Sequence, residues 1–137
     1  MDTNNRFFAR LSGAEEVPPV LTDAFGLAKF KVSRDEKRIG YRLTVNNINN
    51  FTMAHIHIGR RGVNGPVVVF LFGPVDPGIS VNKGVVEGVI TAEDLVGPLE
   101  GRPLSALVDL MRDGKTYVNA HTTQNPDGEI RGQIKPL

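Results

Sequence analysis

The stretch Arg38-Ile39-Gly40-Tyr41-Arg42-Leu43-Thr44-Val45-Asn46 alternates between apolar and polar side chains. Its apolar positions are Ile39, Tyr41, Leu43 and Val45, with polar or charged residues between most of them. Because successive side chains of a β-strand point to opposite faces, this period of two predicts a strand with one buried face. The rest of the sequence repeats the pattern.

Further strand-like runs lie on both sides of this stretch. They occupy residues 7–11, 27–32, 53–58, 66–72, 83–90, 116–122 and 129–135. The run 66–72 is apolar throughout, which predicts a strand covered on both faces. Fifteen glycines and nine prolines separate the runs, as is typical of short turns. We therefore expect an all-β domain, an antiparallel β-sandwich of about eight or nine strands.

Local signals also predict one or two short helices and a turn. Thr91-Ala92-Glu93-Asp94 resembles a capping box, and Pro103 precedes an apolar stripe of helical period that ends before Gly114. Asn125-Pro126-Asp127-Gly128 suits a type I turn between the last two strands. The helices are expected to be minor additions to the strands.

Composition limits the classes of function. The chain has 137 residues, the size of one domain, which we expect to span 1–137 with a core from about 6 to 135. Sixteen basic and fifteen acidic residues leave a formal charge of +1, so we expect neither nucleic acid nor membrane as a partner. The chain has no cysteine, which excludes disulfides, thiol catalysis and cysteine metal sites. No signal peptide is recognisable, so a cytoplasmic location is the default expectation, with export or surface attachment as the alternative.

The three histidines of the sequence all fall on predicted strands. His55 and His57 are two positions apart, so both lie on the face opposite Ala54 and Ile56, and His121 lies on the polar face of the run 117–121. If these strands are neighbours, the three imidazoles converge. Three neutral imidazoles suit one Zn²⁺ or Cu²⁺ ion, with Glu129 or Asn119 as a fourth ligand or as an outer hydrogen-bond partner. The alternative is a set of solvated side chains without metal.

Arginines near these strands suggest a second kind of contact. The loop 59–66 carries Arg60 and Arg61 between glycines, and their guanidinium groups could bind a carboxylate or phosphate of a partner. The alternative for this pair is a solvated connecting loop. Arg131, on the last strand, is expected to pair with a carboxylate rather than to touch a metal ion. Sequence alone leaves these alternatives open.

Five ordered segments resemble the CHRD (chordin-repeat) family. They are 8–13, 16–20, the Ala54-His55-Ile56-His57 strand, 62–68 and Tyr117-Val118-Asn119-Ala120-His121-Thr122, followed by the closing run 125–134. The resemblance covers nearly the whole chain and implies a single β-sandwich of the immunoglobulin-like or superoxide-dismutase-like kind. It implies no established activity. The His-x-His strand also distantly resembles that of copper/zinc superoxide dismutase, but three histidines are too few for that enzyme's two-metal site.

Three hypotheses of function follow. The first is a non-catalytic module that binds one Zn or Cu ion through the three histidines. The second is a module without metal that contacts a protein or a glycan. The third, ranked last, is a mononuclear metal-dependent enzyme, for which Glu129 is the one identifiable general base.

Overall fold

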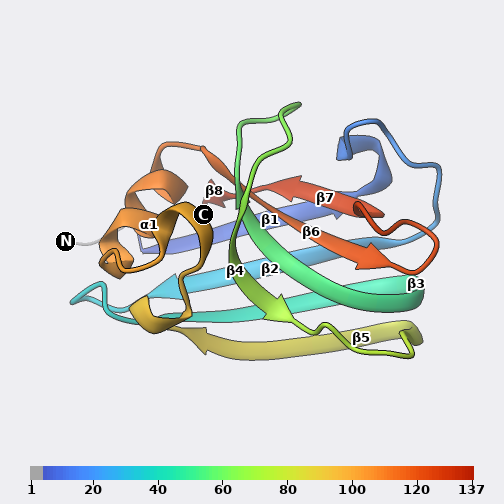
Figure 1. The fold of residues 1–137 in the computed structure, drawn as a ribbon, viewed down its shortest axis with the longest axis horizontal. Helices are drawn as coiled ribbons and strands as arrows, with labels where there is room; N and C mark the ends of the chain where they lie inside the picture. The colour runs from blue at the N-terminus through green and yellow to red at the C-terminus, as the bar shows by residue number, and fades with distance from the viewer. Residues whose placement is uncertain (1–4) are drawn as a thin grey trace.

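A computed structural model describes residues 5–137 and consists mainly of strands (Figure 1). The elements, in chain order, are β1 (Arg6–Ser12), β2 (Phe25–Val32), β3 (Ile39–Ile58), β4 (Val67–Phe72), β5 (Ile79–Ile90), α1 (Leu104–Arg112), β6 (Thr116–Thr122), β7 (Ile130–Gln133) and β8 (Lys135–Pro136). Short 3₁₀ turns occupy Gly13–Glu15, Ala92–Asp94 and Gly97–Leu99. The capping box forms at Thr91 and Asp94, but it opens a single 3₁₀ turn. Within residues 5–137, no helix is long and apolar enough to cross a membrane.

The strands form a closed barrel, so the prediction of a sandwich was wrong. The strand order is β2-β1-β7-β6-β3-β4, and β2 also pairs with β3, which closes a ring of five strands. Outside this ring, β4 and β5 pair with β3, and β8 pairs with β1. Every pairing is antiparallel, so the all-β antiparallel class is confirmed.

The length of β3 explains why the strands close into a barrel. Its 20 residues join two runs that the sequence presents separately. Between them, Asn47 and Asn50 have φ angles of 53° and 56°, in the left-handed region that asparagine tolerates better than most residues. The pairing of β3 with β5 and β6 shifts register nearby. The first half of β3 therefore pairs with β2 and β5, and the second half pairs with β6 and β4.

The apolar face of each barrel strand fills the interior. Leu43, Val45, Ile56 and Val118 are at most 1% exposed, and each such side chain contributes about 1.5 to 3 kcal/mol relative to exposure in water. The predicted apolar stripe of α1 is buried as well: Leu104, Leu107, Val108 and Met111. The expectation for the run 66–72 was wrong in one respect. Phe70 of β4 is 47% exposed, because β4 lies outside the ring and pairs with β3 alone among the described strands.

Candidate metal centre

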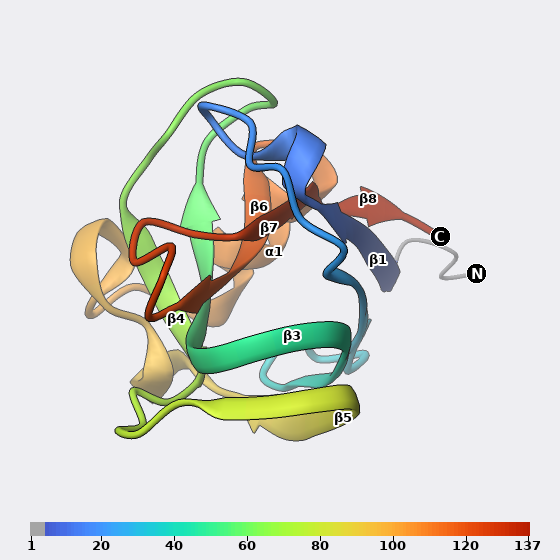
Figure 2. The same ribbon diagram turned by 90° about the vertical axis from the view of Figure 1, so that its right-hand side faces the viewer.

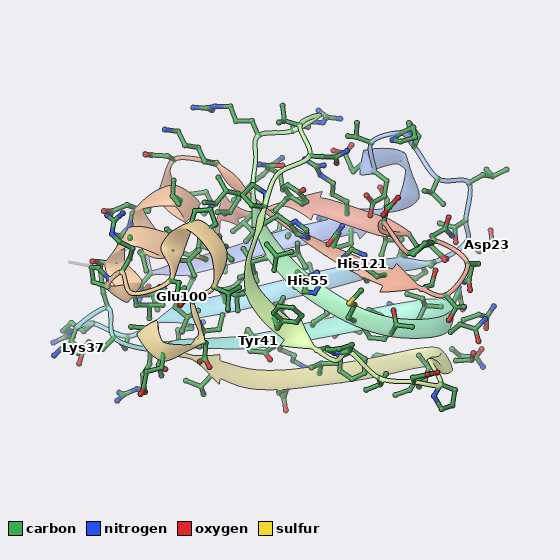
Figure 3. The ribbon with its side chains drawn as sticks, viewed as in Figure 1. Asp23, Lys37, Tyr41, His55, Glu100 and His121 are labelled. Carbon is green, nitrogen blue, oxygen red and sulfur yellow. The ribbon has the colours of Figure 1, made fainter. Side chains whose placement is uncertain are left out.

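The pairing of β3 with β6 brings the three histidines together. His55 is paired with Asn119 and His121 with Met53, while Ala54 and Ile56 alternate with the histidines and point into the barrel. All three imidazoles therefore project from the outer side of the same two neighbouring strands. Figure 3 shows His55 and His121 next to each other near the middle of the molecule.

The histidines are buried on this outer side. His55, His57 and His121 are 4%, 7% and 6% exposed. The Phe70 ring lies edge-on to His55 with 4.4 Å between ring centroids, and the Tyr117 ring stacks on His57 at 4.7 Å. The alternative of solvated imidazoles is therefore wrong, and the polar strand face at these residues is not an open surface for a partner.

The predicted convergence is confirmed by the distances. One nitrogen of each imidazole can be chosen so that all three lie within 4.8 Å of one another. Nδ1 of His55 and Nε2 of His121 are 3.1 Å apart. Two nitrogens bound to one Zn²⁺ ion at tetrahedral angles are separated by roughly 3.3 Å, so this pair already has the spacing of ligands.

Backbone carbonyl groups fix the tautomers of two imidazoles. Nδ1 of His57 is 3.0 Å from the Gly65 oxygen, and Nδ1 of His121 is 2.9 Å from the Pro126 oxygen. A carbonyl oxygen can only accept a hydrogen bond, so each Nδ1 carries a proton. In the neutral imidazole the lone pair is then on Nε2.

His55 is less well satisfied than the other two. Its Nε2 is buried and has no hydrogen-bond partner. Its Nδ1 faces the Nε2 lone pair of His121, so a proton on Nδ1 would make a hydrogen bond there and leave the His55 Nε2 lone pair unused. A buried polar atom without a partner costs about 1 to 3 kcal/mol, and such an atom in a native fold calls for an explanation.

Burial keeps the cluster neutral. Burial, together with the neighbouring imidazoles of His121 and His57, lowers the pKa of His55 to about 3. Burial also lowers the pKa of His57 and that of His121. Neutral imidazole is the form that binds metal ions, so at neutral pH no imidazolium has to lose its charge before binding.

Asn119 connects the cluster to Glu16, which was not predicted to belong to the site. Oδ1 of Asn119 is 2.8 Å from Nε2 of His57, and its amide nitrogen hydrogen-bonds the Glu16 carboxyl group. Glu16 is 5% exposed. Gly128 leaves room for both groups, because a Cβ atom there would lie 2.5 Å from Glu16 Oε2 and 2.7 Å from the Asn119 amide nitrogen.

We expect the stability of the Glu16→Gln variant, relative to that of wild type, to increase as the pH rises. Burial raises the pKa of Glu16 to about 7, although Arg131 and the Asn119 hydrogen bond pull it down. The folded protein thus retains a proton that the unfolded chain loses above its ordinary pKa of 4.5, so wild type loses stability between about pH 4.5 and 7. The substitution removes this loss, a relative gain of about 1 to 3 kcal/mol at pH 8 compared with pH 4.

Urea unfolding in the presence of a chelator measures this difference. Glu15→Gln is the matched control, because the Glu15 carboxylate forms a solvent-accessible pair with Arg61. Its effect should change by less than about 1 kcal/mol over the same pH range. A Glu16→Gln difference that does not vary with pH would show that the buried carboxyl group carries no proton at neutral pH.

The structure places Glu129 in a separate hydrogen-bond network. Its carboxylate accepts hydrogen bonds from the following side chains: Thr22 at 2.6 Å, Thr122 at 2.8 Å, and Gln124 and Asn125 at 3.0 Å each. Burial would raise its pKa, but these hydrogen bonds outweigh burial and lower it. Among the His, Asp and Glu side chains described, the metal-compatible group contains the three histidines and not Glu129.

Arg131 holds the loop 59–66 against the cluster. Its side chain is buried, with the guanidinium carbon 3.5 Å from the centre of the Tyr117 ring. Its nitrogens donate to Asn64 Oδ1 at 3.0 Å and to the carbonyl oxygens of Arg60 and Val63 at 3.0 and 2.7 Å. The positive charge of Arg131 also acts to lower the pKa of the Glu16 carboxyl group, against the larger effect of burial. The loop that carries the His57 acceptor is thus fixed from inside the protein.

The arginines of this loop have different contacts. The backbone oxygen of Arg60 accepts one of the hydrogen bonds from Arg131. The Arg61 guanidinium forms two hydrogen bonds of 2.9 Å with Glu15. The Arg61 side chain is 78% exposed, so this pair lies at the surface and ties the loop to the segment before Glu16.

Comparison with family models gives a match to the CHRD domain over residues 7–134. The chain belongs to the CHRD family. Neither the curated proteins nor the solved structures contain a match to this CHRD domain, so its resemblance to superoxide dismutase stays a prediction. The segments that carry the family resemblance also carry the site: Glu16, His55, His57, Asn119 and His121 lie within them.

Proposed function

We propose that this CHRD domain is a non-catalytic module that binds one transition-metal ion through His55 Nδ1, His57 Nε2 and His121 Nε2. The observation that carries the proposal is the anchoring of His57 and His121 by backbone carbonyl oxygens. Metal-binding histidines usually donate their other N–H group in this way, which orients the ring and raises its basicity.

The contact between His57 and Asn119 supports a cation at this position. With its proton on Nδ1, neutral His57 directs the Nε2 lone pair at Asn119 Oδ1, which is also an acceptor, 2.8 Å away. Two lone pairs at this distance repel each other, and a positive charge bound by both atoms removes the repulsion. We therefore propose Asn119 Oδ1, rather than Glu129, as the fourth ligand.

The donor set limits the metal. Three imidazole nitrogens with an amide oxygen suit Zn²⁺ or Cu²⁺, and they lack the several carboxylates that Ca²⁺ prefers. The engagement of Glu129 in its own hydrogen-bond network favours a binding role over catalysis. Glu129, the residue named for that task from sequence, is already bound by four donors.

Titration of the chelator-treated protein with Zn²⁺ and with Cu²⁺ tests the proposal. We expect one ion per chain, a free energy of unfolding that rises by about 2.7 kcal/mol when free metal is a hundred times Kd, and imidazole nitrogen couplings in the Cu²⁺ electron paramagnetic resonance spectrum. Micromolar-or-weaker binding of both ions, or a spectrum without these couplings, would contradict the proposal.

A further inference from the structure

Strand β5 has one free edge. It pairs with β3 through the register Ile39–Ile90 to Phe51–Ile79, and no other described strand pairs with its second edge. Figures 1 and 2 show β5 at the lower margin of the molecule, beneath β3. The unpaired N–H and C=O groups of such an edge can accept another strand. At 12 residues, β5 is long for an unprotected edge.

The outer face of β5 alternates valines with charges. Along this face the residues are Lys83, Val85, Glu87 and Val89, whereas Val81 packs against the core. Val85 and Val89 are 44% and 58% exposed. These two apolar side chains are therefore exposed on the strand that carries the free edge.

The two charges of this face have unequal partners within the chain. Glu87 is paired across the sheet with Arg42, at 3.8 Å between charged atoms. Lys83 is paired with Asn46, which carries no charge, so no acidic side chain lies across from Lys83 on β3. Glu87 and Lys83 are four residues apart, with Val85 midway between them.

We propose that two copies of this chain associate by antiparallel pairing of their β5 edges about a two-fold axis at Val85. In that register Lys83 of each copy faces Glu87 of the other, and Val85 faces itself. Opposite charges directly across an antiparallel pair are stabilising, and so are paired β-branched side chains. Each Glu87 would then lie between Arg42 of its own chain and Lys83 of the second copy.

Other two-fold registers place unfavourable pairs of side chains across from each other. An axis at Lys83 or at Glu87 sets like charges face to face, and an axis at Gly84 or at Val86 sets both charges against valines. In the same register Gly84 lies across from Val86 and Gly88 across from Asn82, so no charge is opposed there. The sequence of β5 is therefore complementary to itself in this register.

Sedimentation equilibrium over a wide range of protein concentration tests the proposal. We expect wild type to dimerise reversibly, and Lys83→Glu and Glu87→Lys each to weaken dimerisation about tenfold or more, because both cross-strand pairs become repulsive. An equimolar mixture of the two variants should form heterodimers more tightly than either variant alone, since opposite charges face each other again. Arg10→Glu on β1, separated from β5 by β2 and β3, is the control for net charge and should dimerise like wild type.

Three results would overturn the proposal: a wild-type protein that stays monomeric at all concentrations, a dimer that both substitutions leave unchanged, or a mixture no tighter than the separate variants. Circular dichroism of each variant shows whether it is folded. Both substituted side chains are exposed on a strand, so loss of the fold is not expected.

Discussion

His57→Ala is expected to weaken Zn²⁺ and Cu²⁺ binding by about a hundredfold or more. Loss of an outer hydrogen-bond partner of a metal site alone costs roughly 10- to 100-fold in affinity, and this substitution removes a ligand. It also leaves the Gly65 oxygen without its imidazole donor, at a cost of about 1 to 3 kcal/mol in stability. The affinity is therefore measured by isothermal titration on protein whose folded state is verified by circular dichroism.

Glu129→Gln is the control for this substitution. It removes a buried negative charge close to His121 in sequence, but the Glu129 carboxylate belongs to the network of Thr22, Thr122 and the turn that follows. Its metal affinity should stay within about threefold of wild type, even if stability falls by about 1 to 3 kcal/mol. Equal affinities of wild type and His57→Ala would remove His57 from the site. A large loss of metal affinity in Glu129→Gln would indicate that Glu129 is a ligand.

The strands could be predicted from sequence because their signal is local. The period of two in the run 38–46 indicates both the strand and its buried face, and the buried pattern of β3 agrees. Closure of the barrel depends on the β2–β3 pairing and on the bend in β3. The bend has a trace in sequence, the run Asn46-Asn47-Ile48-Asn49-Asn50, but nothing in that run states which strands will pair on each side of it.

The metal-compatible cluster could be predicted in part, for the same reason. Alternation placed each histidine on the polar face of its strand, but the approach of His121 to His55 joins residues 66 positions apart and follows from the β3–β6 pairing. The burial of this face was missed, because the groups that cover it come from loops and from β4. Glu16 was missed for a related reason: it lies in an irregular segment where periodicity has no meaning. Its place in the family motif 16–20 was the available signal.

Arg131→Met is expected to cost about 3 to 5 kcal/mol of the free energy of unfolding. Methionine fills a similar volume but donates no hydrogen bond. The substitution leaves three oxygens of the loop 59–66 without their donor, and it removes the cation that lies over the Tyr117 ring. Breaking a buried charged network by removing one partner costs this much because the remaining groups stay desolvated. Since small domains are stable by only about 5 to 15 kcal/mol, the effect should be plain in urea unfolding with a chelator present.

A second consequence distinguishes Arg131 from an ordinary buried residue. The loop that Arg131 holds also carries the Gly65 oxygen that fixes the His57 tautomer, so Arg131→Met should weaken metal binding as well, by about 10-fold. Arg131→Lys keeps the charge but loses the planar fork, and it should fall between wild type and Arg131→Met in both measurements. Arg61→Met is the matched control, because its ion pair with Glu15 is exposed and worth at most about 1 kcal/mol. If Arg131→Met lowers the free energy of unfolding by no more than about 1 kcal/mol, the loop is held by other contacts. The position of His57 would then not depend on this arginine.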